Sequence, residues 1–370
     1  MNKLLTEVCD IQYGYAFDSA KFSADQGIPL IRIRDVVRGF SETYTTEVCD
    51  QEYIVNDGDI LIGMDGEFNI ARWKGGKAYL NQRVCRLLPK DGVDAMYLYY
   101  FMPQALKAIE DKTPFVTVKH LSAKELNKIV VTVPTIEDQK KIANCLQRLD
   151  ELISLRKQQL SKLDELVESR FIEMFGDPVY NPNRLPTKPL ANLGSLDRGR
   201  SKHRPRNDPK LLGGPYPLIQ TGEVSNAGLY ITEYQNTYSE LGLQQSKMWN
   251  AGTLCITIAA NIAQTAILTF NACFPDSVVG FIPTDEIDAI YMHYWFSFFQ
   301  KMLDEQAPQV AQKNINLKIL SELQVTIPSK EEQQEFVAFV KHTDKSKFEI
   351  QKSLEKLETL KKALMQKYFG

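Results

Sequence analysis

The sequence predicts an α+β fold: two pseudo-two-fold related mixed α/β domains separated by two long antiparallel helices that form a coiled-coil-like spacer. Three observations predict it. The chain contains an internal repeat at an offset of 194 residues. In each half, β-branched runs alternate with glycine-containing turns, which is typical of strands. Each half then ends in about forty residues without proline or glycine, which is typical of a long helix.

The repeat is clearest toward the end of each half. Residues 131–134 (VTVP) match 325–328 (VTIP), and Phe175-Gly176 matches the final Phe369-Gly370. Further upstream the offset slips to 188, where residues 29–31 and 217–219 both read PLI. The two halves therefore differ by short insertions in their globular parts.

We predict globular domains at 1–133 and 190–327, with a linker at 177–189 that leads from the first long helix into the second domain. Strands are expected at 28–33, 59–62, 129–133 and 254–258, next to turn signals such as Asn56-Asp57-Gly58. Residues 95–110 and 288–304 carry aromatic and apolar residues at helical spacing. These two helices occupy the same relative place in each half.

The long helices are predicted at 135–175 and 329–369, within segments 134–176 and 328–370. Thr135 and Ser329 can cap their amino ends, with acids in the first turn. Apolar residues recur at three- and four-residue spacing, which favours a seam between two helices. The alternative is that each helix lies only on its own domain. The predicted seam comprises Ile142, Leu149, Ile153, Leu160, Leu163, Val340, Ile350, Leu354, Leu357 and Leu364.

Composition excludes several classes of protein. The 44 Lys plus Arg against 46 Asp plus Glu give a net charge of −2, so any nucleic-acid contact must be local. The first residues lack the apolar stretch of a signal peptide, and the 6 cysteines form no CxxC pair. We expect a cytoplasmic protein without membrane contact, with reduced thiols and no metal site.

Two basic segments make DNA the candidate ligand. Six basic residues and no acid lie between Phe68 and Lys90, among Trp73, Tyr79, Asn81 and Gln82. Residues 198–206 hold five cations. Cations contact phosphates, and Arg, Gln and Asn also read base edges. The alternative is that both loops are merely solvated. The predicted DNA-binding residues are Arg32, Arg34, Arg72, Lys74, Lys77, Gln82, Arg83, Lys119, Arg198, Arg200, Lys202, Arg204, Arg206, Gln220, Thr221 and Lys313.

The sequence offers no convincing catalytic motif, so we predict no catalytic residue. Residues 194–201 mimic a phosphate loop, but Arg200 stands where lysine is required. Residues 177–180 (DPVY) are one proline short of a methyltransferase loop and lie in the linker. Asp138 and Lys140 have nuclease spacing but open the long helix, where cap chemistry explains them better.

The whole chain resembles the specificity (S) subunits of type I restriction-modification systems. Residues 12–17 (QYGYAF) with 27–35 (GIPLIRIRD) look like the opening of one target recognition domain. Residues 199–202 (GRSK) with 214–223 (GPYPLIQTGE) look like the opening of another. Both long helices are entered through Pro-x-x-Glu-[Asp/Glu]-Gln, similar to the family's two conserved regions.

This resemblance implies a non-catalytic subunit that binds a two-part asymmetric sequence in double-stranded DNA. Each target recognition domain would bind one half-site, and the helical spacer would set the gap between them. Two modification (methyltransferase) subunits would dock on the chain, and restriction (translocase and nuclease) subunits would join. S-adenosylmethionine, Mg²⁺ and ATP would be bound by those partners, with no cofactor on this chain.

Two other functions stay open at this point. The first is a non-catalytic coiled-coil adaptor whose helices tether other proteins and which reads no DNA sequence. The second is a self-sufficient enzyme, which would require methyl transfer by the purified chain alone.

Overall fold

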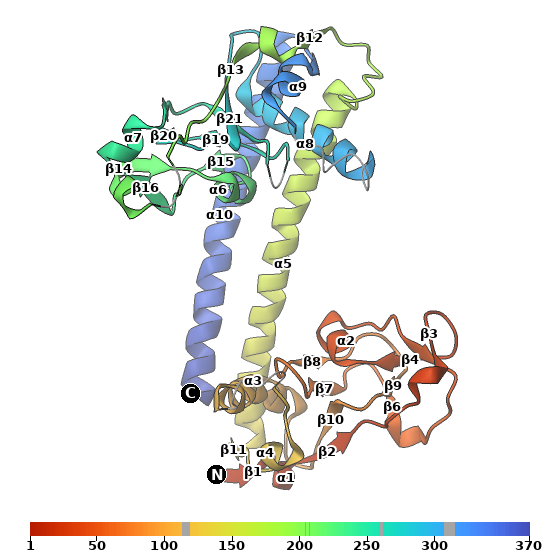
Figure 1. Cartoon of the computed structure of the whole chain (residues 1–370). Coiled ribbons are helices and arrows are strands. Elements are labelled where there is room, and N and C mark those ends of the chain that lie inside the picture. The colour runs from red at the N-terminus through yellow and green to blue at the C-terminus, as the bar shows by residue number, and fades with distance from the viewer. Residues whose placement is uncertain (113–118, 204, 207, 260–261, 307–314) are drawn as a thin grey trace. The chain divides into compact units, whose positions relative to one another are not determined.

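The computed structural model describes residues 1–370 except 113–118, 204, 207, 260–261 and 307–314. It divides into two compact units: unit 1 is Met1–Lys157 with Gln351–Gly370, and unit 2 is Gln158–Ile350. Both chain ends therefore belong to unit 1 (Figure 1). Each long helix contributes one part to each unit, whereas the predicted domain boundaries treat the helices as separate segments.

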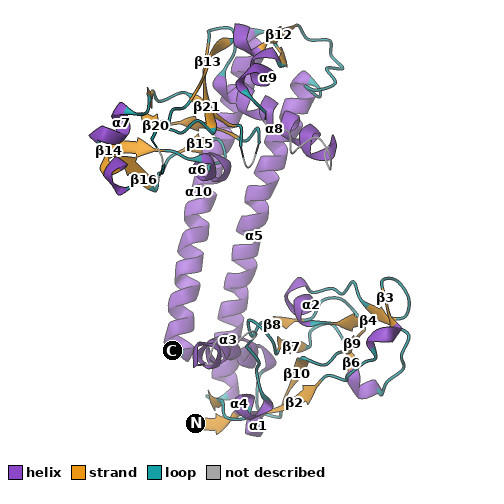
Figure 2. Cartoon of the chain, in the orientation of Figure 1, coloured by secondary structure: helices purple, strands orange, loops and turns teal. Residues whose placement is uncertain are grey.

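Unit 1 consists of short strands and helices around the start of one long helix (Figure 2). Its strands are β1 (Asn2–Leu4), β2 (Cys9–Tyr13), β3 (Phe22–Ser23), β4 (Ile28–Ile31), β5 (Tyr44–Thr45), β6 (Ile54–Val55), β7 (Ile60–Gly63), β8 (Ile70–Arg72), β9 (Ala78–Leu80), β10 (Val84–Pro89) and β11 (Val130–Thr132). Its helices are α1 (Leu5–Val8), α2 (Ile33–Arg38), α3 (Ala95–Lys112), α4 (Ala123–Leu126), the first part of α5 (Ile136–Phe175) and the last part of α10 (Lys330–Phe369), with 3-10 turns at Ser19–Lys21 and Gln51–Tyr53.

Unit 2 repeats this order of elements. Its strands are β12 (Thr187–Pro189), β13 (Gly194–Arg198), β14 (Leu212–Leu218), β15 (Tyr230–Ile231), β16 (Asn236–Tyr238), β17 (Met248–Trp249), β18 (Leu254–Thr257), β19 (Thr265–Leu268), β20 (Ala272–Cys273), β21 (Val278–Pro283) and β22 (Gln324–Thr326). Its helices are α6 (Thr221–Asn226), α7 (Glu240–Gln244), α8 (Ala289–Gln306), α9 (Leu317–Glu322), the last part of α5 and the first part of α10, with 3-10 turns at Leu190–Asn192 and Pro209–Leu211.

The sheets of the two units correspond. In unit 1 the strand orders are β2-β10-β7-β8, β3-β5-β4-β9-β6 and β1-β11. In unit 2 they are β13-β21-β18-β19-β15, β16-β14-β20-β17 and β12-β22. The central strands β10 and β21 both run antiparallel to their two neighbours, and β7 and β18 are buried along their whole length. The predicted fold class is confirmed.

The long helices run antiparallel to each other within each unit. In unit 1, Asp150 pairs with Lys361 and Lys157 pairs with Glu358, so residue numbers rise along α5 as they fall along α10. In unit 2, Asp164 pairs with Lys347 and Arg170 with Glu335, in the same sense. Such exposed ion pairs each contribute little to stability but report the register.

The predicted seam residues lie on the less exposed side of these helices. Leu149, Val340 and Leu354 are buried, and the other seven are half-buried. Ile142, Leu357 and Leu364 pack against Leu149 and Tyr100 in unit 1. In unit 2, Val340 belongs to a large core with Phe171 and Phe336.

Each long helix begins with a capped turn and a buried glutamine. Thr135 and Ser329 accept hydrogen bonds from the N–H groups of Asp138 and Glu332, as the capping pattern predicts. One turn along, the Gln139 carboxamide accepts from the Asp94 N–H at 2.9 Å and donates to the Gly92 and Pro134 carbonyls. Gln333 makes the same three contacts with Asp288, Glu286 and Pro328. These contacts join each helix to the loop before α3 or α8.

Two further findings bear on the sequence expectations. The six cysteines are free, and four of them are buried. No helix among the described residues combines the length and apolar content that a bilayer-spanning segment requires.

Replacing Gln139 by alanine should lower the free energy of unfolding of unit 1 by about 2 to 3 kcal/mol. The substitution leaves one part-buried N–H and two carbonyls without their partner and removes the buried side chain that joins them. Urea unfolding followed by circular dichroism measures the change. Lys140→Ala, an exposed change on the next residue, is the control and should stay within about 0.5 kcal/mol. Equal midpoints for Gln139→Ala and wild type would contradict this role.

Unit 2 should lose stability in mild acid through His293 on α8. Burial lowers the pKa of this imidazole from 6.5 to about 4, with Thr265 Oγ1 3.0 Å from its Nδ1. Between those values the unfolded chain binds a proton that the folded chain does not. Stability should therefore fall by about 3 kcal/mol as pH drops from 6.5 to 4.

The measurement is the change in urea midpoint between pH 7 and pH 4.5. His293→Asn should show a smaller loss than wild type, whereas the exposed control His342→Asn should keep the wild-type loss. An unchanged loss in His293→Asn would disprove the contribution.

Candidate nucleic-acid interface

The basic segment of unit 1 forms the turn between β8 and β9. The side chains of Arg72, Lys74 and Lys77 are exposed, and none makes a hydrogen bond or ion pair within the described part of the chain. Trp73 is buried beneath this turn, where its indole N–H donates to the Gly76 carbonyl at 2.7 Å. The turn therefore exposes three cations to solvent, and the buried Trp73 holds it in place.

Other residues of the same segment serve the fold. Arg86 is 9% exposed and donates to Gln12, to Asp59 and to the carbonyls of Glu52 and Ile54. Lys90 pairs with Asp10 and donates to the Thr6 carbonyl. Tyr79, like Trp73, is buried, so neither ring is open for stacking on a base. The number of basic residues in this segment is therefore larger than the number that is free to contact DNA.

A second group of predicted residues lines one pocket. Arg32, Arg34, Gln82 and Arg83 surround a cavity of about 470 Å³ together with Asn81, Ile33, Phe17, Phe22 and Ser19. Arg32 and Arg34 flank the first residue of α2, and the others come from the turn between β9 and β10. Arg83 also contacts the His120 ring and pairs with Asp65, whose carboxylate offsets part of its charge. The structure brings these four predictions together although they are distant in sequence.

The turn that carries Gln82 is held by a close approach of two backbones. A Cβ on Gly14 would lie 2.0 Å from the Asn81 carbonyl oxygen, so only glycine fits. The Tyr15 N–H donates to the Leu80 carbonyl at 2.9 Å, and the Gln82 N–H donates back to Tyr15 at 2.8 Å. Arg83 has a left-handed φ of 71°, which is uncommon for a residue other than glycine.

The basic segment of unit 2 lies at a different place in the repeated fold. It follows β13, whereas that of unit 1 follows β8. The Arg198 guanidinium donates to the Asp276 carbonyl, and the Arg206 guanidinium pairs with the Asp276 carboxylate. Arg200 reaches Asp197 only at 4.0 Å, and the side chain of Lys202 is exposed. Arg200 and Lys202 are therefore the more available cations.

The remaining predicted residues have separate environments. Gln220 is exposed and Thr221 half-buried at the start of α6, the position that Arg32 and Ile33 occupy at α2. Lys119 is 19% exposed and donates to the Glu110 carbonyl at 2.8 Å, which argues against a phosphate contact. Arg204 and Lys313 lie outside the described residues. All sixteen assignments stay predictions.

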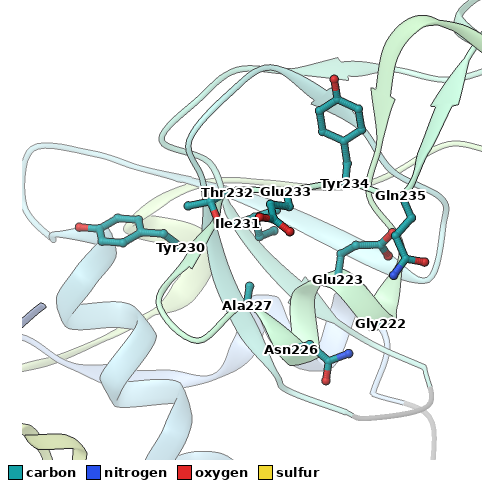
Figure 3. A pocket seen from close by; sticks show the side chains of 10 residues that line it. All are labelled: Gly222, Glu223, Asn226, Ala227, Tyr230, Ile231, Thr232, Glu233, Tyr234 and Gln235. Atoms are coloured by element: carbon teal, nitrogen blue, oxygen red, sulfur yellow. The ribbon is translucent and has the colours of Figure 1, made fainter. Parts of the chain in front are cut away.

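Sequence reasoning missed a pocket of about 520 Å³ in unit 2. Figure 3 shows its lining residues, which come from α6, β15 and the segment that follows. Glu223, Glu233, Asn226 and Gln235 give it a polar and partly acidic lining, which suits hydrogen-bond donors better than phosphates. Its residues lie outside both basic segments, so charge gave no signal for it.

The structure gives no support for metal chemistry in its described part. No group of three or more His, Cys, Asp or Glu side chains there is arranged to hold a metal ion. The half-buried His293 contacts Thr265, and its ring lies edge-on to that of Tyr294.

Comparisons with known proteins agree on one family. A model of the type I restriction modification DNA specificity domain matches residues 1–165 and 187–362. The type I restriction enzyme EcoBI specificity subunit of Escherichia coli is 28% identical over 401 residues, covering 99% of this chain and 84% of that protein.

Solved structures show the same fold. The type I restriction-modification S subunit from M. genitalium matches with a TM-score of 0.64 at 15% identity, covering 100% of this chain and 96% of that one. A chain from a study of complex assembly and conformational transition of the type I R-M system matches with a TM-score of 0.60 at 16% identity, covering 100% and 97%.

Gly14→Ala should destabilise unit 1 by more than about 2 kcal/mol, because the new methyl group would overlap the Asn81 carbonyl. Gly222→Ala is the matched control: nothing lies within 4 Å of its added Cβ, and it sits in α6. The control should be neutral or slightly stabilising. Thermal unfolding of the purified variants measures both, and a wild-type midpoint for Gly14→Ala would refute the close approach.

Proposed function

The chain belongs to the family of type I restriction-modification specificity (S) subunits, and on this premise we propose that it selects a bipartite asymmetric target in double-stranded DNA. Each unit binds one half-site in this proposal. The observation that carries it is that the units share a fold yet differ in their exposed polar surface. Unit 1 exposes Arg72, Lys74 and Lys77, whereas unit 2 exposes Arg200 and Lys202 at another place.

The proposed division of labour follows from the chemistry of each surface. Exposed cations contact phosphates and supply affinity without sequence preference. The pockets at the starts of α2 and α6 offer carboxamide, carboxylate and guanidinium groups, which distinguish bases by their hydrogen-bonding edges. Because the lining residues of these pockets differ, the two units would select different half-sites.

We also propose that the long helices hold the modification subunits. Several apolar side chains on these helices face solvent, including Leu155 (54% exposed), Phe348 (65%), Leu152 and Leu166. Their exposure on two otherwise polar helices supports a role in binding other proteins. In this proposal the restriction subunits join that assembly, and S-adenosylmethionine, Mg²⁺ and ATP are bound by the partner subunits while this chain does no chemistry.

A triple substitution of Arg72, Lys74 and Lys77 by alanine should weaken DNA binding and its dependence on salt. Each lost phosphate contact should reduce the slope of log K against log[salt] by about 0.9, so three contacts reduce it by up to about 3. Fluorescence anisotropy with a labelled duplex, measured over a salt series, gives both values.

The control replaces three exposed lysines of the long helices, Lys140, Lys352 and Lys356, by alanine. It makes the same change in net charge and should leave the slope unchanged. Equal slopes in all three proteins would exclude these three cations as DNA contacts. Undetectable DNA binding by the wild-type chain, alone and in complex with its modification subunit, would favour the adaptor function instead.

A further inference from the structure

The turn formed by Asn81, Gln82 and Arg83 occupies a place that both units build in the same way. In unit 1 the Gly14 N–H donates to the Val84 carbonyl at 3.0 Å, and the turn follows β9. In unit 2 the Gly199 N–H donates to the Val278 carbonyl at 2.9 Å. A Cβ on Gly199 would lie 2.3 Å from the Pro275 carbonyl oxygen, the same close approach as at Gly14.

The side chains at this place differ completely between the units. Unit 1 has Asn81, Gln82 and Arg83, and unit 2 has Pro275, Asp276 and Ser277. The two units share the backbone that supports these side chains. The backbone N–H of Arg200 donates to the Phe274 carbonyl, just as the backbone N–H of Tyr15 donates to the Leu80 carbonyl. The repeated frame thus presents three different side chains in each unit. Such a position can change which bases are read without changing the fold.

Among the described residues, the carboxamide oxygen of Asn81 has no hydrogen-bond partner, and Asn81 is one of the residues that line a pocket. Its side chain lines the cavity of about 470 Å³ beside Arg32 and Arg34. The residue is 8% exposed, and its carboxamide oxygen is buried without a hydrogen-bond partner among the described residues. An unpaired buried acceptor costs free energy, which a ligand bearing a donor would recover.

The remaining lining residues suit a nucleobase. The half-buried Phe22 provides apolar ring surface beside the buried Phe17, and the exposed side chains of Arg32 and Arg34 provide positive charge for neighbouring phosphates. A carboxamide holds an acceptor and donors side by side. This arrangement matches the adjacent amino group and ring nitrogen of adenine.

We propose that this pocket of unit 1 binds an adenine of the first half-site and that the Asn81 carboxamide reads its edge. The inference rests on the proposed function and deepens it, since it assigns one base of the target to one side chain. Arg32 and Arg34 contact the flanking phosphates, and the tightly held turn keeps Asn81 in place before DNA binds.

The test is selection from a random-sequence duplex pool by the full chain, alone and with its candidate modification subunit. In Asn81→Asp, the side chain keeps its size but loses the donor to the adenine ring nitrogen. Enrichment of adenine at one position of one half-site should fall about tenfold. The other half-site should keep its wild-type preference. Asn56→Asp, an exposed asparagine of the same unit, is the matched control and should select the wild-type sequence.

A second variant covers the case in which Asn81→Asp does not fold. Ser19 is exposed on the pocket wall, so Ser19→Trp fills the cavity without changing the turn. It should lose the same adenine preference. Wild-type selection by both variants at both half-sites would overturn the assignment, as would loss at both half-sites in Ser19→Trp.

Failure of the inference differs from failure of the proposed function. A wild-type chain that enriches a two-part motif with no adenine dependent on Asn81 leaves the proposed function standing and overturns the pocket assignment. A wild-type chain that enriches no sequence in either setting overturns both.

Discussion

The structure depends on the buried glutamine at the start of each long helix. Gln139 and Gln333 tie the first turn of α5 and α10 to the loops before α3 and α8, through one accepted and two donated hydrogen bonds each. Because three backbone groups converge on one carboxamide, the helix can leave its globular part in one direction only. The Tyr97 and Tyr291 hydroxyls add a matching bond to the carbonyls of Thr132 and Thr326. The proposed binding of a two-part target requires such a fixed exit.

The same frame carries two different surfaces. Its glycines, Gly14 and Gly199, bring two backbone segments close enough to hold the turn after β9 and the turn after β20. The residues on these turns are free to differ, because the frame is made by backbone atoms. The basic segments likewise arise at unrelated places, after β8 in unit 1 and after β13 in unit 2. One fold can therefore support two recognition surfaces, which is what a bipartite target requires.

The fold class could be predicted because the repeat at one offset and the proline-free helical periodicity can both be read directly from the sequence. The helices predicted at 135–175 and 329–369 begin one residue later, at Ile136 and Lys330. Sequence reasoning could not distinguish the cations that stabilise the fold from those that are exposed to solvent. Arg86 is held by Gln12 and Asp59, which lie 74 and 27 residues away along the chain, and no local pattern reveals that. The burial of Asn81 could not be predicted either, since it depends on the contact of its turn with Gly14 and Tyr15.

The central claim is that the two units read two halves of one DNA sequence on behalf of a methyltransferase. Co-expression of the chain with its candidate modification subunit, followed by mapping of adenine methylation across the genome, tests it most directly. We predict a methylated two-part motif with a fixed gap, whose first half changes when unit 1 is exchanged for that of a relative. A stable complex that methylates no such motif would contradict it, and absence of any complex would favour the adaptor.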